Sequence, residues 1–584
     1  MINSAATALD PIHNLSIGKI IEVDGARVIA ELDSDISDLS RIYAGETYPI
    51  GQFGSIIRIH FGRRVIYGMV GRLRMKAEYE AEKGVAPHAS PDERVVEAEL
   101  FGEASWGVDE AGLPKFIFER GVSTYPLPQQ TVYLTPKSEL RNIYGGTGRP
   151  AIELGTHVGT SNAPCYADLN ELLGKHTAIL GSTGSGKSGA VAALLHGIVN
   201  HGQKCGYQNW NPRIIVLDPH NEYGAAFADH RRLSTDEGSL ALPYWMLNLE
   251  ETIGLLVGKT EHAATSQANI VKNALLEARS QAASELGFVT ERTTVDAPIP
   301  YVLGDPRGLD EFGERDGGRY TEGFVGAINA QRPDNKNRKD HQDYGKVLRK
   351  LESLINDDRL RFMMRPWSGD SDDLAEILAQ LVGEGSMVRV IDLSGVPNEV
   401  AGVTTSVVSR MLFSIKVWQT SNERESSPVL LVCEEAHRYV PNRGEAQYEE
   451  AQSAIRRIAK EGRKYGLSLL LVSQRPSEVE TTVLSQCNSW LVLRTTNDAD
   501  REHVRGVLPD SMTGLSKMLP GLRRREAIFV GQAAALPSRI IIRELRVDET
   551  PKSNDVDFDK GWQSEPLDSQ KLTEVAQRWR YQER

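Results

Sequence analysis

The most informative motif is a glycine-rich run that ends in lysine and a hydroxyl residue. Residues 181–188 fit the pattern G-x-x-x-x-G-K-[ST], between the apolar run 177–180 and the helix-like run 190–195. In that context backbone N–H groups wrap nucleotide phosphates, Lys187 reaches the β- and γ-phosphates, and Ser188 binds Mg²⁺. The sequence therefore predicts a site for ATP and Mg²⁺. The residues expected to bind the nucleotide are Gly181, Ser182, Thr183, Gly184, Ser185, Gly186, Lys187 and Ser188.

Two acidic residues, Glu434 and Glu435, follow the apolar run 429–433. In-line hydrolysis of a γ-phosphate needs the metal and the attacking water to be held by separate groups. We therefore expect Glu434 to bind Mg²⁺, through water, and Glu435 to polarise the attacking water. Acids that follow a strand are commonly solvated loop residues, and the phosphate-binding run upstream is what favours catalysis here.

A glutamine and an arginine complete the expected catalytic set. Gln474 follows another apolar run, where its neutral amide can contact both the γ-phosphate and the attacking water. A nucleotide site at a subunit boundary usually needs a cation from the neighbouring subunit, to offset charge on the transferring phosphoryl group. Arg463 is the first candidate for this cation, with Arg494 and Lys175 as alternatives. A basic helical face such as 456–464 is otherwise solvated surface.

These side chains require a scaffold that brings them together. From about residue 168 short apolar runs alternate with helical stretches, which is typical of a parallel sheet covered by helices. Four runs end at Gly181, Asp218, Asp392 and Glu434, and the carboxyl ends of parallel strands share one edge of a sheet. We favour a functional role for Asp218, whereas Asp392 is better explained as the cap of a turn or helix.

The remaining chain predicts three further parts around this α/β core. Strand-like runs fill the first part, and Asp24-Gly25 between two of them predicts a hairpin turn, so we expect a small β-barrel. A largely helical insertion separates the apolar runs before Asp218 and Asp392, and the chain ends in a polar tail with little periodicity. The expected domains are the N-terminal barrel at 1–160, the ATPase core at 161–547 with the insertion at about 225–385, and the tail at 548–584.

Composition excludes several classes of protein. The 584 residues carry 67 basic and 79 acidic side chains, a formal charge of -12, so the whole chain has no general attraction to nucleic acid. Its four cysteines lack a C-x-x-C spacing, which argues against a structural zinc site or a disulfide framework. Uninterrupted apolar stretches are too short to cross a membrane and the N-terminus lacks a secretory signal, so we expect a cytoplasmic protein without membrane contact.

The motifs taken together resemble those of HerA-type ATPases of the HerA/FtsK superfamily, of the bacterial type associated with antiphage defence. The strand-rich beginning is similar to the N-terminal barrel of that family. Three positions depart from the family's usual pattern: Asn221 stands where Gly is frequent, Glu434 where Asp is more usual, and Lys175 where some members have Arg. The motifs, in the family's order, are 181–188, 218–223, 434–439, 461–466 and 473–476.

The resemblance implies an α/β fold with a RecA-like P-loop NTPase core, a small N-terminal β-barrel and a helical insertion. It implies a hexameric ring with ATP between subunits, a central channel for double-stranded DNA, and hydrolysis coupled to translocation. It also implies partners: archaeal members work with a NurA-type nuclease, and similar bacterial members are paired in antiphage systems with a sirtuin-like NAD-hydrolysing protein or a nuclease effector.

Three functions compete on this basis. The first is an ATP-dependent double-stranded DNA translocase or helicase that acts as a homohexameric ring with such an effector. The second is an ATP-regulated ring scaffold that assembles and activates an effector without moving DNA, which the charge of -12 and the lack of a dense basic stripe favour. The third is a rotary or secretion-type ATPase, which the missing membrane anchor and the motif 473–476 disfavour.

Overall fold

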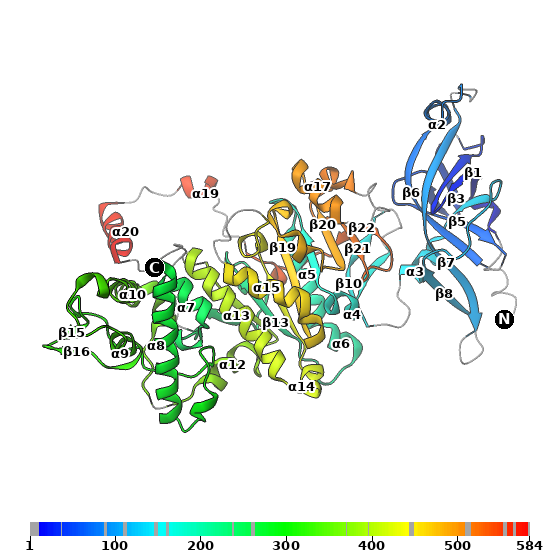
Figure 1. Cartoon of the computed structure of the whole chain (residues 1–584). Helices are drawn as coiled ribbons and strands as arrows, with labels where there is room; N and C mark the ends of the chain where they lie inside the picture. The colour runs from blue at the N-terminus through cyan, green and yellow to red at the C-terminus, as the bar shows by residue number, and fades with distance from the viewer. Residues whose placement is uncertain are drawn as a thin grey trace. The chain divides into compact units, whose positions relative to one another are not determined.

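The computed structural model is drawn in Figure 1 with its helices and strands labelled. It consists of two compact units. The first unit is formed by residues 1–207, 474–477 and 487–545, and the second by residues 208–473, 478–486 and 546–584. The residues described are 11–36, 38–62, 64–86, 90, 92–108, 114–144, 150–158, 163–235, 239–257, 263–369, 371–394, 396, 398–442, 449–507, 516–552, 558–563 and 568–581.

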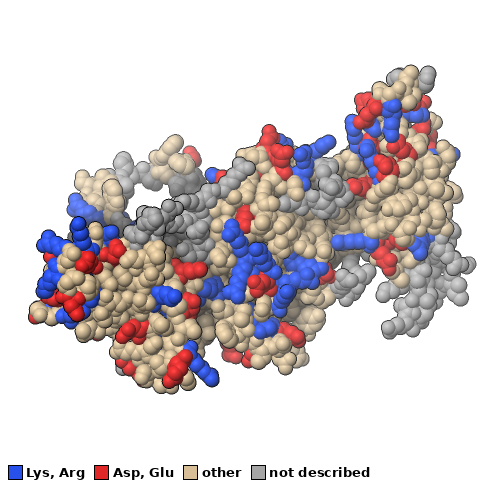
Figure 2. Space-filling model, viewed as in Figure 1, with Lys and Arg blue, Asp and Glu red and all other residues tan. Residues whose placement is uncertain are grey.

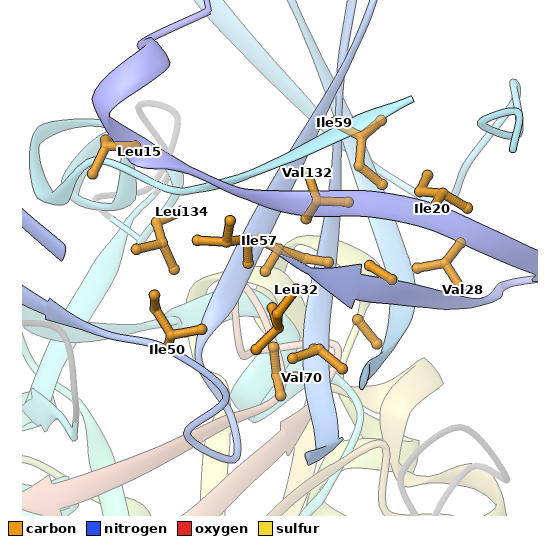
Figure 3. Packing of buried hydrophobic residues seen from close by; sticks show 14 of the residues in the cluster. Leu15, Ile20, Val28, Leu32, Ile50, Ile57, Ile59, Val70, Val132 and Leu134 are labelled. Carbon is orange, nitrogen blue, oxygen red and sulfur yellow. The ribbon is translucent and has the colours of Figure 1, made fainter. Parts of the chain in front are cut away.

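A closed six-stranded barrel begins the first unit, as the sequence predicts. The strand order is β2-β1-β9-β5-β6-β7, and an additional pairing of β2 with β7 closes it, while β8 extends β7 outside the ring. Apolar side chains such as Ile20, Val28, Ile57 and Val132 fill the interior (Figure 3). The strands are β1 Ser16–Asp24, β2 Arg27–Leu32, β5 Ile56–Phe61, β6 Arg64–Met75, β7 Arg94–Val108, β8 Pro114–Arg120 and β9 Thr131–Leu134, with a separate hairpin of β3 Ser40–Tyr43 and β4 Glu46–Pro49.

The hairpin between β1 and β2 is confirmed, but its turn lies one residue later than predicted. Asp24 pairs with Arg27, so the two turn residues are Gly25 and Ala26. Gly25 has a φ of 55°, the left-handed value that a tight hairpin turn requires and that glycine adopts without strain. Asp24 therefore ends the strand and does not form part of the turn.

The sheet of the first unit carries the glycine-rich run. Its strands lie in the order β11-β10-β22-β21-β20-β12, and only β12 and β20 in this set are parallel neighbours. These strands are β10 Ala151–His157, β11 Pro164–Asp168, β12 Thr177–Leu180, β20 Ser489–Leu493, β21 Glu526–Gly531 and β22 Ser538–Ile542. The helices of this unit include α2 Lys76–Glu82, α3 Lys137–Tyr144, α4 Leu169–Gly174, α5 Lys187–Val199, α6 His201–Cys205 and α17 Asp498–Val507.

The barrel is attached to this sheet through the turn between β21 and β22. Arg120, at the end of β8, donates hydrogen bonds to the backbone carbonyls of Gly531 and Ala535, at 3.2 and 3.0 Å. Leu536 beside this turn packs in one buried cluster with Tyr67 of the barrel and Tyr144 of α3. The β21–β22 turn therefore contacts the barrel. Arg525, just before β21, donates a backbone hydrogen bond to Ser185 of the glycine-rich run.

Five parallel strands form the sheet of the second unit, in the order β19-β18-β13-β17-β14. They are β13 Arg213–Asp218, β14 Arg231–Ser234, β17 Val388–Asp392, β18 Val429–Cys433 and β19 Leu467–Ser473. All residues of β17, β18 and β19 are buried, which confirms the predicted apolar runs. The sequence interpretation named no strand at β14 here, nor at β10, β11 and β20 in the sheet of the first unit. Helices α13 Asn398–Trp418, α14 Ser421–Ser426, α15 Glu449–Glu461 and α16 Thr481–Leu484 accompany this sheet.

Between β14 and β17 the chain is largely helical. The buried Arg279 of α8 donates hydrogen bonds to the backbone carbonyls of Trp245 and Leu247, at 3.1 and 2.7 Å, which ties α8 to the preceding segment. The elements are α7 Leu249–Leu256, α8 Ala263–Glu285, α9 Gly323–Ala330, α10 Arg338–Ile355, α11 Arg361–Met364, α12 Leu374–Val382 and a hairpin of β15 Glu314–Arg315 with β16 Gly318–Arg319.

The C-terminal residues contain helices where the sequence suggests little periodicity. They are α19 Phe558–Trp562 and α20 Ser569–Tyr581. Leu572, Val575 and Trp579 are exposed on α20, and their spacing of three and four residues places them on one face of the helix. The sequence interpretation missed this face because it contains only a few apolar residues.

One helix among the described residues is long and apolar enough to cross a membrane by length and composition. It is the part of α13 from Val400 to Trp418, 19 residues with a mean hydropathy of 1.3. Polar residues interrupt its apolar sequence, so it does not stand out as an uninterrupted apolar run. Its apolar window is 72% buried inside the protein, as in the core helix of a folded domain.

Candidate nucleotide site

The glycine-rich run connects β12 to α5, the strand–loop–helix context that phosphate binding requires. Gly184 and Gly186 have φ values of 73° and 98°, which favour glycine. A Cβ at Gly186 would lie 3.3 Å from the backbone nitrogen of Arg525, so a side chain there would press on the neighbouring backbone. Two of the predicted glycines are therefore required by the shape of the loop.

Backbone hydrogen bonds from β20 and β21 fix the loop. The Ser182 N–H donates to the carbonyl oxygen of Arg494 at 2.9 Å, and the Arg525 N–H donates to the carbonyl oxygen of Ser185 at 3.1 Å. Lys187 opens the 13-residue helix α5 with a side chain that is 8% exposed, and Ser188 follows it. The N-terminus of such a helix favours a bound anion, because its first N–H groups have no partner within the helix.

Gln474 contacts the glycine-rich loop directly. The Thr183 hydroxyl donates a hydrogen bond of 2.6 Å to the side-chain oxygen Oε1 of Gln474, which immediately follows β19. The amide predicted to contact the γ-phosphate is thus connected to the predicted phosphate loop through a hydroxyl. Thr183 was expected only as one of the nucleotide-binding residues, and the structure adds its contact with Gln474.

The two acids at the end of β18 are both buried, with Glu434 3% and Glu435 4% exposed. They are therefore not the solvated loop residues of the alternative interpretation. Glu434 accepts a hydrogen bond of 3.0 Å at Oε2 from the hydroxyl of Tyr223. Glu435 has a φ of 54° and a ψ of 47°, a left-handed conformation that residues other than glycine rarely adopt.

A histidine lies beside Glu435 and was not predicted. Nδ1 of His437 is 3.2 Å from Oε2 of Glu435, and the same nitrogen is 3.2 Å from the hydroxyl oxygen of Ser473. His437 therefore contacts the expected catalytic acid and the last residue of β19. Its place in the motif 434–439 was visible in the sequence, but its partners were not.

Asp218 closes the loop that follows β13. Its carboxylate accepts hydrogen bonds from the backbone nitrogens of His220 and Tyr223, at 3.2 and 2.9 Å. Burial raises the pKa of Asp218 above its ordinary value, and the nearby Asp392 adds to the increase. Asn221 in this loop has a φ of 53°, which explains why glycine suits the position and why asparagine is tolerated.

Asp392 has the structural environment that the sequence favours. Its carboxylate accepts hydrogen bonds from the Arg232 guanidinium, at 2.6 Å from Nη2, and from the backbone nitrogen of Ser394, at 2.9 Å. These bonds join β17 to the neighbouring β14 and begin the turn after β17. Asp392 thus caps a turn.

The cation candidates differ in their surroundings. Arg463 lies in the short 3₁₀ helix Gly462–Tyr465 after α15 and is exposed, as is its neighbour Lys464. Basic side chains gather over α15 in Figure 2. Lys175 forms an ion pair of 2.7 Å with Glu171 and also donates to the side chain of Gln532, while Arg494 accepts the bond from the glycine-rich loop through its backbone. Exposure keeps Arg463 as the first candidate for contact with another subunit.

The donor types suit Mg²⁺ in the presence of a nucleotide. Ser188 and Glu434 offer a hydroxyl and a carboxylate, the oxygen ligands that Mg²⁺ prefers, and Mg²⁺ at such sites is completed by substrate phosphates and water. Within the described ranges no group of three or more His, Cys, Asp or Glu residues is arranged to hold a metal by itself.

Comparison with known proteins gives this geometry a family context. Residues 152–412 match the family model described as "Helicase HerA, central domain". The DNA double-strand break repair helicase HerA of Pyrococcus furiosus is 27% identical over 436 residues, which cover 71% of this chain and 73% of that protein. The helicase of the same name from Saccharolobus solfataricus is 26% identical over 406 residues, or 69% and 70% of the two chains.

Among solved structures, VirB4 of Thermoanaerobacter pseudethanolicus superposes with a TM-score of 0.46 and 17% identity, over 69% of this chain and 99% of that one. The α/β fold with a barrel, a P-loop core and helices is seen directly in the strand order. The helicase relatives confirm the prediction of a helicase-like ATPase. Residues 152–412 are thus similar to the central domain of HerA helicases, and the two relatives described above bear the name HerA.

Proposed function

We propose that this protein is an ATP-driven double-stranded DNA translocase of the helicase type, which works as a homohexameric ring. The observation that carries the proposal is the hydrogen bond of 2.6 Å from Thr183 to Gln474. A translocase must convert the state of its nucleotide into movement, and this bond connects the predicted phosphate loop to the end of a strand. DNA as the substrate is supported by the names of the relatives, which are DNA double-strand break repair helicases.

The described residues divide the reaction among them. Backbone N–H groups of 181–186 and the Lys187 ammonium bind the phosphates, and Ser188 with Glu434 would hold Mg²⁺, which neutralises phosphate charge when bound. Glu435 accepts a proton from the attacking water, and the Gln474 amide orients that water. Arg463 of a neighbouring subunit offsets the charge that develops on the transferring phosphoryl group.

The partner is proposed from the resemblance in the sequence. We infer an effector that is a sirtuin-like NAD hydrolase or a nuclease, acting with the ring in antiphage defence in the cytoplasm. The domain limits at residues 160 and 547, and the tail from 548, also stay predictions. Co-purification with the product of a neighbouring gene, followed by assays for NAD hydrolysis and DNA cleavage, tests the partner.

The proposed function is tested by steady-state ATP hydrolysis with and without linear duplex DNA, at low and moderate salt. Glu435→Gln provides the blank, and light scattering gives the number of subunits. We expect duplex DNA to raise the rate several-fold and salt to remove the gain, because salt weakens phosphate contacts. A rate that ignores DNA at every salt concentration, or a stable monomer with full activity, contradicts the translocase.

The second candidate is a ring scaffold whose ATP site regulates an effector without DNA movement. The observation that favours it is the pairing of basic residues with acids: Lys336 lies 3.2 Å from Glu314, and Arg338 lies 2.9 Å from Glu311. Basic and acidic side chains are also intermixed on the face in Figure 2, and the formal charge is -12. Effector activity that survives Glu435→Gln and needs no DNA would favour the scaffold over the translocase.

A further inference from the structure

Tyr223 is a fully buried tyrosine whose hydroxyl points at one of the two acids. Its side chain is 0% exposed, and its hydroxyl donates to Oε2 of Glu434 at 3.0 Å. The two residues are 211 positions apart in the sequence, yet both lie at the carboxyl ends of neighbouring parallel strands, β13 and β18. A hydroxyl buried at this position has one clear acceptor, and that acceptor is the carboxylate predicted to bind Mg²⁺.

The loop after β13 is built to hold this tyrosine in place. The Asp218 carboxylate accepts the backbone N–H of Tyr223 at 2.9 Å, and the Tyr223 carbonyl in turn accepts the N–H of Ala226 at 3.0 Å. The left-handed backbone at Asn221 turns the chain between Asp218 and Tyr223. Both ends of the tyrosine are therefore anchored, its backbone to Asp218 and its hydroxyl to Glu434.

The two groups fix the direction of the hydrogen bond. A tyrosine hydroxyl can donate its proton, whereas an ionised carboxylate only accepts. The buried Tyr223 hydroxyl therefore donates to Oε2 of Glu434. A carboxylate that accepts from a fixed donor at one oxygen is held in one rotamer, with its charge directed through the other.

We propose that Tyr223 is a positioning residue for metal binding, which holds the Glu434 carboxylate in the orientation that binds Mg²⁺. The proposal rests on the proposed function, since it assumes that the site binds ATP with Mg²⁺. It assigns a task to the last residue of the motif 218–223 and explains how the longer glutamate serves at a place where aspartate is more usual in the resembling family. The longer side chain has one more rotatable bond, and the tyrosine restricts it.

The test measures metal affinity directly, apart from turnover. Mn²⁺ replaces Mg²⁺ as a paramagnetic probe, and its binding to the ATP complex of the full-length Glu435→Gln protein is titrated by electron paramagnetic resonance. Tyr223→Phe is added to this background, because Phe keeps the buried ring and removes only the hydroxyl. The matched control is Tyr244→Phe, which removes another buried tyrosine hydroxyl that donates one hydrogen bond, at 2.5 Å to the carbonyl of Tyr301.

We expect Tyr223→Phe to weaken Mn²⁺ binding about ten-fold, the size of one hydrogen bond to a charged group, and Tyr244→Phe to leave it unchanged. In the Glu435 wild-type background, Tyr223→Phe should raise the half-saturating Mg²⁺ concentration by a similar factor while saturating Mg²⁺ restores turnover. Added to Glu434→Gln, it should weaken Mn²⁺ binding no further, because Tyr223 acts through the carboxylate.

The outcomes separate the inference from the function on which it rests. Equal Mn²⁺ affinity in the parent and in Tyr223→Phe overturns the inference, and so does a loss that appears equally in Tyr244→Phe with equal lowering of the melting temperature. In both cases the parent still binds Mn²⁺ with ATP, so the proposed function stands. A parent protein that binds no ATP-dependent Mn²⁺ overturns the proposed function together with the inference.

Discussion

The glycine-rich loop and the acidic end of β18 are built in opposite ways. In the loop, the backbone provides both the shape and the fixing contacts, through the φ values of Gly184 and Gly186 and the bond from Ser182 to the Arg494 carbonyl. At the end of β18, side chains provide the contacts. The hydroxyl of Tyr223 donates a hydrogen bond to Glu434, and His437 lies beside Glu435.

This difference determines how each region can be recognised and how it fails. A site made by backbone geometry leaves a compact motif in the sequence, since glycine is needed at fixed positions. A site made by side-chain partners is spread along the chain, and each partner can be removed singly without changing the local backbone. The loop should therefore lose function completely when its lysine is lost, whereas the acids should lose function in graded steps.

The largest effect is expected from Lys187→Ala. The lysine places a positive charge against the β- and γ-phosphates, so its loss should weaken ATP binding by about 100-fold or more and abolish turnover. Binding is measured with a fluorescent ATP analogue. Lys204→Ala, at an exposed lysine of α6, is the control and should bind ATP normally. Normal ATP binding by Lys187→Ala would show that the glycine-rich loop is not the phosphate site, and the contrast with the acidic end of β18 would no longer hold.

The next largest effect separates the acids from the loop. Glu435→Gln keeps the shape of the side chain but removes the proton acceptor, so ATP should still bind while turnover falls about 1,000-fold. Single-turnover measurements distinguish slow chemistry from slow product release. Glu502→Gln, at an exposed glutamate of α17, serves as the control. Hydrolysis at the wild-type rate would show that Glu435 is not the base.

Arg463→Ala should lower turnover by about 100-fold without dissociating the proposed ring, since we propose that this arginine acts from a neighbouring subunit on the developing charge. The neighbouring exposed Lys464→Ala is the matched control. Rings mixed from Arg463→Ala and Lys187→Ala subunits should recover part of the activity, because each subunit supplies what the other lacks. Mixed rings as inactive as the pure variants would contradict action in trans.

A smaller effect is expected at the hydrogen bond from Thr183 to Gln474, in which a side chain of the glycine-rich loop contacts a side chain outside the loop. Thr183→Val removes the hydroxyl donor but keeps the shape, so turnover should fall about ten-fold while ATP affinity changes little. Thr183→Ser keeps the donor and should retain most of the activity. If both variants behave alike, the hydroxyl is not what connects Gln474 to the loop.

The smallest effect concerns the loop that positions Tyr223. Asn221 adopts a φ of 53°, so Asn221→Ala should lower the free energy of unfolding by about 1 kcal/mol, whereas Asn221→Gly should leave it nearly unchanged. Urea denaturation of the three proteins measures the difference. An alanine variant as stable as the wild type would show that the loop relaxes to another backbone shape.

The sequence predicts the fold well where apolar runs are long and fully buried. The runs at 177–180, 214–217, 388–391, 429–433 and 467–472 became β12, β13, β17, β18 and β19. The short strand β14 was missed because arginines form half of it, and they hide the periodicity of a strand. β20 also went unpredicted, although all its residues are buried. The helical face of α20 was missed because only a few apolar residues form it.

The candidate site was predictable in its parts but not in its contacts. The types and spacing of residues 181–188 specify a phosphate loop by themselves, because only local backbone geometry is involved. The contact of Tyr223 with Glu434 depends on the pairing of β13 with β18, which joins positions more than two hundred residues apart. The contact of His437 with Ser473 likewise depends on the pairing of β18 with β19. Such contacts follow from tertiary structure and leave no local pattern.

The left-handed backbone of Glu435 lowers the stability of this protein. A residue with a side chain in that conformation costs roughly 1 kcal/mol or more relative to glycine. Glycine at position 435 would relieve that cost and leave no carboxylate. A search for heat-resistant variants that scores stability alone would therefore favour the replacement. The selected protein would be more stable, but it would lack the carboxylate expected to activate water. Screens of this chain need to select for turnover and stability together.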